Sequence, residues 1–306
     1  MSTKTPHSSV LRLQLERISP FLTDPETTEV CINRPGSVFV ETRRGWQRHD
    51  LPDAITANWI GDVARAAATA AGQHLNAQHP ILSSTLPDGE RLQVVIPPAV
   101  DDHDVGAITI RRPDLRTRSR SEYEEDGLMT EVRRADQAAP EDVELSDLYE
   151  AGRYWDFLET AVKTRKNIVI SGATGSGKTM FTRALINYIP THERIITLED
   201  TRELFLPNHP NRVHLLFSEG GQGQGGVSAK ALLQSALRMK PDRILLSEVR
   251  SRVAYDYIVT VSSGHPGSIT TVHAESTRGA LEMLMLRVKE SPEGQGMDRT
   301  EIMALL

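Results

Sequence analysis

One stretch of eight residues constrains the fold of this chain more than any other. It reads Gly172, Ala173, Thr174, Gly175, Ser176, Gly177, Lys178 and Thr179, and it matches the pattern G-x-x-x-x-G-K-[ST] at every fixed position. Residues 167–171 before it are apolar and β-branched, which is typical of a buried strand, and residues 180–188 after it have helical composition. A strand, a glycine-rich loop and a helix in this order predict a phosphate-binding P-loop.

The residue types in this loop suit it to bind phosphate groups. Glycines allow backbone N–H groups to converge on phosphate oxygens, and the N-terminus of the following helix favours negative charge. Lys178 can reach the β- and γ-phosphates of a nucleotide, and the Thr179 hydroxyl can hold Mg²⁺. The sequence therefore predicts ATP and Mg²⁺ as cofactors.

The composition narrows the class of protein. A chain of 306 residues with 39% hydrophobic and 25% charged residues suggests a globular protein of about two domains. The net charge of −6 gives no support for nucleic acid as the main partner. The single cysteine, Cys31, cannot form an internal disulfide, and no run approaches the roughly 20 apolar residues of a membrane span. We therefore expect a cytoplasmic protein that could still dock on a membrane complex.

The pattern of hydrophobic residues predicts two domains of different architecture. Residues 1–112 should form an α+β domain with an antiparallel sheet, including a hairpin around Pro87-Asp88-Gly89-Glu90. Residues 113–144 are charged and poor in large apolar residues, which indicates a solvated interdomain linker rather than a basic patch for nucleic acid. From residue 145 to residue 306, strands and helices alternate, which predicts an α/β domain with a parallel sheet.

Polar side chains follow several predicted strands of this second domain. Glu199, Asp200 and Glu203 follow one strand, Glu248 follows another, and His273 follows a third. Ligands of open α/β sheets bind at the carboxyl ends of the strands, so these side chains should meet the glycine-rich loop.

Each of these side chains also has a purely structural alternative. Glu248 could be a salt-bridged carboxylate at a strand end, and His273 could simply be hydrogen-bonded there. The acids at 199–203 could cap a turn or pair with Arg202. The glycine-rich stretch 220–226 lacks lysine, which favours a mobile surface loop over a second phosphate cradle.

Four ordered blocks resemble the secretion-superfamily ATPases. They are the P-loop, an acidic box at 198–204, a Walker B block at 245–251, and a histidine box at 264–274. Within that superfamily the chain is most similar to the hexameric ATPase of bacterial type IV secretion, the VirB-eleven type, and the resemblance covers nearly the whole chain. The Walker B block departs from the family pattern because Ser247 stands where glycine is usual, and the chain stops at Leu306, shorter than the family leads us to expect.

The resemblance implies a RecA-like P-loop NTPase and assigns roles to its residues. Lys178 and Thr179 would bind phosphate and Mg²⁺, and Glu203 and Glu248 would serve hydrolysis and the metal. His273 would be a further site residue. Arg111 or Arg112 would reach the nucleotide from the N-terminal domain.

The resulting hypothesis is a ring-forming, Mg²⁺-dependent ATPase that powers type IV secretion. Its implied partners are further copies of itself, inner-membrane secretion subunits and other secretion ATPases, with peripheral membrane association possible and direct nucleic-acid binding not expected. Because Lys178 is the only strong side-chain cation of the P-loop, we also expect an arginine near the Walker B strand, such as Arg250 or Arg238, to complete a neighbour's site. The alternatives are a pilus or type II secretion motor, a P-loop DNA translocase or recombinase, and a small-molecule kinase.

Overall fold

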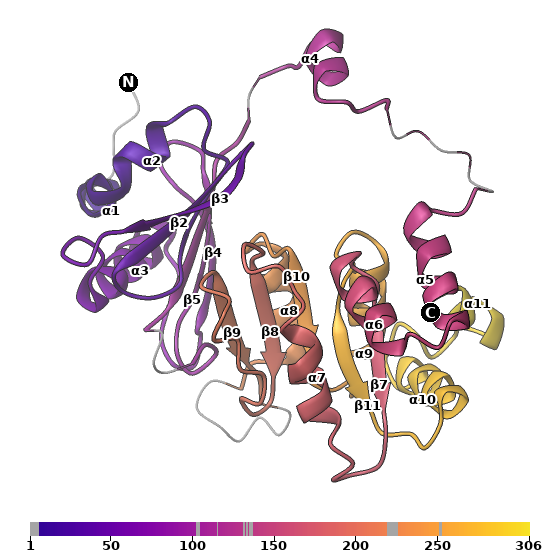
Figure 1. The fold of residues 1–306 in the computed structure, drawn as a ribbon. Helices are drawn as coiled ribbons and strands as arrows, with labels where there is room; N and C mark the ends of the chain where they lie inside the picture. Colours follow the sequence, from indigo (N-terminus) through magenta and orange to yellow (C-terminus); the bar gives the residue numbers. More distant parts are fainter. Residues whose placement is uncertain are drawn as a thin grey trace.

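An antiparallel sheet and a set of parallel strands, both with covering helices, form the α/β structure of this chain, as seen in the computed structural model (Figure 1). The structure describes residues 6–101, 105–114, 116–130, 132, 134, 137–218, 226–250 and 253–306. The surface loop predicted at 220–226 lies outside the described residues, apart from Gly226.

The N-terminal sheet is antiparallel throughout, as the sequence predicts. Its order is β3-β2-β1-β6-β5-β4, and each neighbouring pair runs antiparallel. The strands are β1 (Glu29–Ile32), β2 (Ser37–Thr42), β3 (Gly45–Asp50), β4 (Ile81–Thr85), β5 (Arg91–Val95) and β6 (Ala107–Arg111).

Three helices pack on the N-terminal sheet: α1 (Pro6–Leu15), α2 (Ser19–Thr23) and α3 (Ala57–Ala71), with a short 3₁₀ turn η1 (Glu16–Ile18) between the first two. The Thr56 side chain caps the start of α3 by accepting from the Trp59 amide, and Gly72 ends the helix at a φ of 64°. Trp59 is buried in one core with Leu11 of α1 and Val30 of β1. The helices therefore cover the apolar face of this sheet.

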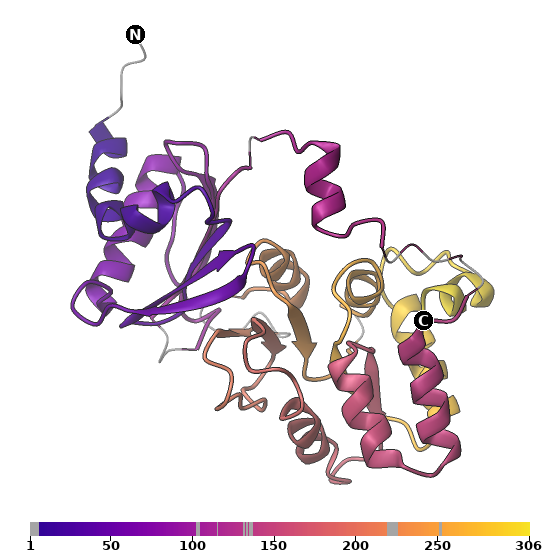
Figure 2. The ribbon, with the colours of Figure 1, turned by 45° about the horizontal axis from the view of Figure 1, so that its top comes forward.

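The predicted linker at 113–144 is partly helical. Helix α4 (Arg120–Glu125) begins with a capping box between Ser119 and Glu122, which satisfies amides at its N-terminus. Helix α5 (Pro140–Glu150) already starts inside the predicted linker. Figures 1 and 2 show α4 standing away from both sheets on the connection that crosses between them.

The C-terminal half contains a parallel sheet made of two hydrogen-bonded groups. Strands β10 (Arg243–Leu246), β8 (Ile195–Glu199) and β9 (Arg212–Leu216) form one group, and β11 (Ile269–Val272) and β7 (Ile168–Ser171) form the other. Hydroxyl groups join β11 to β10: Ser268 Oγ donates to Ile244 O (2.6 Å) and Thr271 Oγ1 donates to Ser247 O (2.8 Å). Residue numbers increase in the same direction along β11 and β10 in these two bonds, so the two strands run parallel. The strand order of the whole parallel sheet is therefore β7-β11-β10-β8-β9.

Alternating side chains of these strands bury the two faces of the parallel sheet against different helices. Ile195 and Leu245 pack with α6 (Tyr154–Lys163) and α7 (Lys178–Ile186). Their neighbours Ile196 and Leu246 pack on the opposite face in a second core. That second core takes residues from four helices, α8 (Ala229–Leu237), α9 (Ala254–Ser262), α10 (Thr277–Lys289) and α11 (Arg299–Leu305).

The two halves of the chain share buried contacts. Val95, Ala99 and Val100 of the N-terminal half lie in the same hydrophobic core as Ile196 of β8, and Val100 forms an isolated antiparallel bridge with Leu215 of β9. Figure 1 shows the N-terminal sheet standing beside β9 and β8, on the side away from β7. The parallel sheet therefore has the N-terminal half at one edge.

A fully buried arginine fastens the two halves together. Arg194, just before β8, donates to Asn33 Oδ1 (2.9 Å) and Thr109 Oγ1 (3.3 Å) of the N-terminal sheet. The same guanidinium donates to Asn211 Oδ1 and to the Met239 carbonyl (2.8 Å) of its own half. These acceptors are all uncharged, so the cation is stabilised by hydrogen bonds from both sides of the interface.

Among the described residues, no helix is both long enough and apolar enough to cross a membrane.

The Arg194 contacts generate a stability prediction. Arg194→Met should lower the free energy of unfolding by at least about 2 kcal/mol, because it leaves several buried acceptors without a donor. Urea denaturation measures the change. Arg48→Met, which removes the exposed pair between Arg48 and Asp50, should stay within about 0.5 kcal/mol of the wild type. Equal midpoints for the two variants would contradict a fastening role for Arg194.

Candidate functional site

The 172–179 loop joins the end of β7 to the start of α7 and depends on its glycines. Gly175 and Gly177 have φ values of 77° and 87°, which side chains rarely tolerate. A Cβ on Gly172 would lie 2.5 Å from Ser176 Oγ, so a larger residue there would force that hydroxyl to move. Helix α7 begins at Lys178, and the loop therefore presents backbone amides at a helix N-terminus, as an anion site requires.

The Lys178 ammonium group is held by the loop itself. Its Nζ donates to the carbonyls of Gly172 and Ala173, both at 2.9 Å. It also lies 3.3 Å from Nδ1 of His273, which follows β11. The cation is thus placed at the mouth of the loop, where an incoming phosphate would replace carbonyl oxygens as its partner.

The second contact of the site joins a hydroxyl to an acid. Thr179 Oγ1 donates to Glu203 Oε2 at 3.1 Å. Glu203 lies in the turn after β8, and its carbonyl accepts from Arg183 Nε (2.7 Å), one turn further along α7. Oxygen ligands are the ones that Mg²⁺ prefers, so Thr179 and Glu203 are the residues that would hold this ion.

The third contact series runs from His273 to Asp200. His273 Nε2 lies 3.3 Å from Glu248 Oε1, and Arg250 donates to the other oxygen of Glu248 at 3.1 and 3.3 Å. Arg250 also donates to Asp200 Oδ2 at 2.6 Å. Lys178, His273, Glu248, Arg250 and Asp200 thus form one chain of alternating donors and acceptors along the carboxyl edge of the sheet.

This arrangement brings together most of the residues that the sequence analysis predicted for the site. Strands β7, β11, β10 and β8 each deliver a polar side chain to the same edge, as parallel strands must. The edge contains cations for phosphate, an acid beside a hydroxyl, and a carboxylate next to an imidazole. Among the described residues no group of three or more His, Cys, Asp or Glu side chains could hold a metal ion.

Three predicted arginines lie elsewhere in the chain. Arg238 follows α8 and precedes β10, so it lies at the amino edge of the sheet, whereas Glu248 follows the other end of β10. Arg111 ends β6 and lines the same pocket as Arg238. Arg112 is turned onto the N-terminal backbone, where its guanidinium donates to the carbonyls of Asp24 and Thr27.

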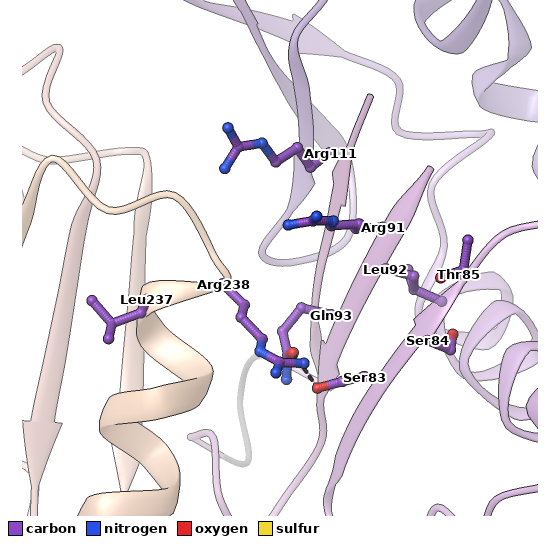
Figure 3. Close-up of a pocket in the computed structure, with 9 residues that line it drawn as sticks. All are labelled: Ser83, Ser84, Thr85, Arg91, Leu92, Gln93, Arg111, Leu237 and Arg238. Carbon is purple, nitrogen blue, oxygen red and sulfur yellow. Dashed lines mark hydrogen bonds between the residues drawn. The ribbon is translucent and has the colours of Figure 1, made fainter. Parts of the chain in front are cut away.

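The pocket shared by Arg111 and Arg238 is strongly basic. It has a volume of about 510 Å³, and its lining includes Arg91 but no acid. Figure 3 shows Arg91 and Arg111 pointing from the N-terminal sheet toward the end of α8, and Arg238 pointing back toward Gln93 and Ser83. Three guanidinium groups around one opening favour an anionic occupant.

A buried acid lies behind this basic pocket. Glu29 of β1 is 1% exposed and lines an adjoining cavity of about 620 Å³ together with Arg91 and Lys240. Burial raises the pKa of Glu29 to about 8, and the Arg111 guanidinium at 3.5 Å opposes this effect without overcoming it. Glu29 is therefore largely neutral at pH 7.

Sequence reasoning missed several residues that contact these two sites. Arg183 lies one helical turn after Thr179, and that spacing could have identified it. Arg91 directly follows the predicted hairpin turn at Pro87-Asp88-Gly89-Glu90, but only its register with Arg111 brings it to the pocket. Asp101, which bonds Arg202 from the N-terminal half, had no sequence signal at all.

Comparison with known proteins identifies close relatives along almost the whole chain. A family model described as type II/IV secretion system protein matches residues 13–291. The type IV secretion system protein VirB11 of Bartonella quintana is 43% identical over 97% of this chain and 86% of its own length. The type IV secretion system protein PtlH homolog of Bordetella bronchiseptica is 40% identical over 95% of this chain and 86% of its own.

A solved structure agrees with the fold. The crystal structure of the VirB11 ATPase from the Brucella suis type IV secretion system, in complex with sulphate, has a TM-score of 0.90 and 41% identity. The match covers 98% of this chain and 87% of that one.

The raised pKa of Glu29 predicts a pH-dependent stability. Between about pH 4.5 and pH 8 the folded chain holds a proton on Glu29 that the unfolded chain has released, so raising the pH lowers the free energy of unfolding. Glu29→Gln should remove this contribution. Urea unfolding of both proteins at pH 5, 6.5 and 8 should show the wild type losing stability relative to the variant, and parallel curves would contradict it.

Proposed function

This chain belongs to the type II/IV secretion system protein family, and we propose that it is the ATP-hydrolysing motor of a type IV secretion machine. In this proposal six copies form a ring at the cytoplasmic face of the inner membrane, and ATP hydrolysis with Mg²⁺ drives substrate translocation or pilus assembly. The similarity to VirB11 proteins supports the assignment to type IV secretion. The proposal of ATP hydrolysis rests on the contact series Lys178–His273–Glu248, with Thr179 and Glu203 beside it.

The proposed chemistry assigns a task to each of these side chains. Lys178 exchanges the carbonyls of Gly172 and Ala173 for phosphate oxygens, since a charged acceptor makes a stronger hydrogen bond than a carbonyl. Thr179 and Glu203 supply oxygens to Mg²⁺, which neutralises phosphate charge when bound. Glu248 orients the attacking water, and His273 bridges Glu248 to Lys178, so that it can respond to the terminal phosphate.

The arginine that completes the site comes, in our proposal, from a neighbouring subunit. Arg250 already contacts Glu248 and Asp200 of its own chain, so it is suited to a role in its own site. Arg91, Arg111 and Arg238 instead gather at a pocket far from the loop of their own chain. In a head-to-tail ring such a pocket can meet the next subunit's phosphates.

Glu248→Gln should separate binding from hydrolysis. The substitution keeps the shape of the side chain but removes the charge that orients water, so turnover should fall about 100-fold or more while ATP binding persists. Lys178→Ala should lose a similar factor because it removes a preorganised cation. ATPase assays and equilibrium nucleotide binding measure both effects.

A remote carboxylate provides the matched control for Glu248→Gln. Glu290→Gln, directly after α10, removes only the exposed contact with Arg287 and should leave ATP hydrolysis at the wild-type rate. If Glu248→Gln lost ATP affinity but kept its turnover per bound ATP, Glu248 would be a metal-binding or structural residue instead.

Mixing inactive subunits tests the shared site. Lys178→Ala subunits mixed with Arg238→Ala subunits should regain activity, since about a quarter of the sites in a mixed head-to-tail ring would be intact. Lys178→Ala mixed with Glu248→Gln should regain none, because both defects lie in the same chain's part of the site. ATPase assays on rings of defined mass decide between the outcomes, and failure of the first mixture would remove Arg238 from the neighbour's site.

A further inference from the structure

Glu199 is the acid that shapes the turn carrying Glu203. It ends β8, is fully buried, and its Oε2 accepts from the amides of both Glu203 and Leu204 at 2.7 Å. Two hydrogen bonds to a buried carboxylate are strong, so they fix the path of the turn. The position of Glu203 beside Thr179 therefore depends on Glu199, which does not itself face the phosphate site.

The other oxygen of Glu199 contacts Thr197 of β8 and His214 of β9. Thr197 Oγ1 donates to Glu199 Oε1 at 2.7 Å, and His214 Nδ1 lies 2.9 Å from the same hydroxyl and 3.4 Å from Glu199 Oε1. His214 is a β9 residue with a 1% exposed side chain. Because these polar groups are buried and close-packed, they have few alternative positions. A displacement of β9 would therefore also displace Glu199.

The free edge of β9 is covered by the N-terminal half. The Asp101 amide donates to the His214 carbonyl (3.3 Å), and the Leu216 amide donates to the Ala99 carbonyl (2.9 Å). The Asp101 carboxylate, in turn, accepts from Arg202 Nη1. Arg202 immediately precedes Glu203, so the N-terminal half holds the turn at two points: through β9 and through this ion pair.

We propose that Asp101 and Arg202, with Glu199 as their buried anchor, are positioning residues that let the N-terminal half set the placement of Glu203. The inference rests on the proposed ATPase function, which it extends by naming the route between the N-terminal half and the acid. Glu203 is exposed and lies outside any helix or strand, so its placement depends on contacts with other parts of the chain. Displacing such a group by about 1 Å can cost about 100-fold in rate.

The Asp101–Arg202 ion pair is partly shielded from solvent, so water weakens its attraction less than it weakens that of an exposed pair. The Asp101 side chain is 10% exposed and the Arg202 side chain is 29% exposed. The Arg202 guanidinium also lies over the ring of Phe205, 5.5 Å from its centroid. A second ion pair across the interface, Lys240–Glu41 at 2.9 Å, lies before β10 at the amino edge, and it therefore provides a control that does not contact the Glu203 turn.

The test compares two carboxylate-to-amide variants of the full chain. Asp101→Asn should lower kcat about tenfold and leave the Kd for ADP within about twofold, because it displaces the acid without touching the nucleotide loop. Glu41→Gln, which weakens the other interface pair, should keep kcat within about twofold of the wild type. Equal kcat values for the two variants, or a parallel loss of ADP affinity in Asp101→Asn, would overturn the proposal.

A conservative substitution on the other partner separates positioning from general damage. Only one Arg202 nitrogen contacts Asp101, so Arg202→Lys can keep the ion pair and should retain most of kcat. Arg202→Ala should resemble Asp101→Asn. If Arg202→Lys were as impaired as Arg202→Ala, the charge would not be what holds the turn.

Hydrogen exchange gives a readout that does not require activity. The Glu203 and Leu204 amides should exchange about tenfold faster in Asp101→Asn than in the wild type, while Glu41→Gln should leave them protected. If the wild type failed to hydrolyse ATP, the proposed function would fall and this exchange comparison alone would decide the positioning role. Unchanged exchange in Asp101→Asn would overturn it.

Discussion

The structure depends on parallel strand pairing in the C-terminal half. Because β7, β11, β10 and β8 run in one direction, the residues that follow them meet at one edge, although they are separated by up to about 100 positions in sequence. Parallel pairing therefore brings Lys178, Glu203, Glu248 and His273 to the same edge. The hydroxyl bonds from Ser268 and Thr271 to β10 keep the two strand groups in register, and that register brings His273 within reach of Glu248.

The carboxyl edge holds its charges in contact with one another. Lys178 rests on the Gly172 and Ala173 carbonyls and next to His273, and Glu248 is shared between His273 and Arg250. Each group has a partner, so no isolated charge has to be kept desolvated. A bound triphosphate would compete for Lys178 first, and release of Lys178 from His273 would change the surroundings of Glu248. In the proposed mechanism, one contact series would therefore link phosphate binding at Lys178 to water orientation by Glu248.

The sequence predicted the family, the antiparallel N-terminal sheet and most of the carboxyl edge, because these depend on local patterns. A glycine loop has its own signature, and an acid after an apolar strand can be recognised without knowing its neighbours. Features that depend on packing between halves were not predictable. Asp101 reaches Arg202 only because the N-terminal half covers β9, a strand that the sequence analysis did not identify. Arg250 turned toward its own Glu248, which no spacing rule specifies.

The N-terminal half contacts the C-terminal half near both the carboxyl and the amino ends of the parallel strands. At the carboxyl edge Asp101 bonds Arg202 beside Glu203, and at the amino edge Arg91 and Arg111 share a pocket with Arg238. Arg194, fully buried between the halves, restrains movement between these two regions. A rotation of the N-terminal half would alter the Glu203 turn of its own chain and the basic pocket together. If that pocket serves a neighbour, the same rotation carries the state of one phosphate site to the next.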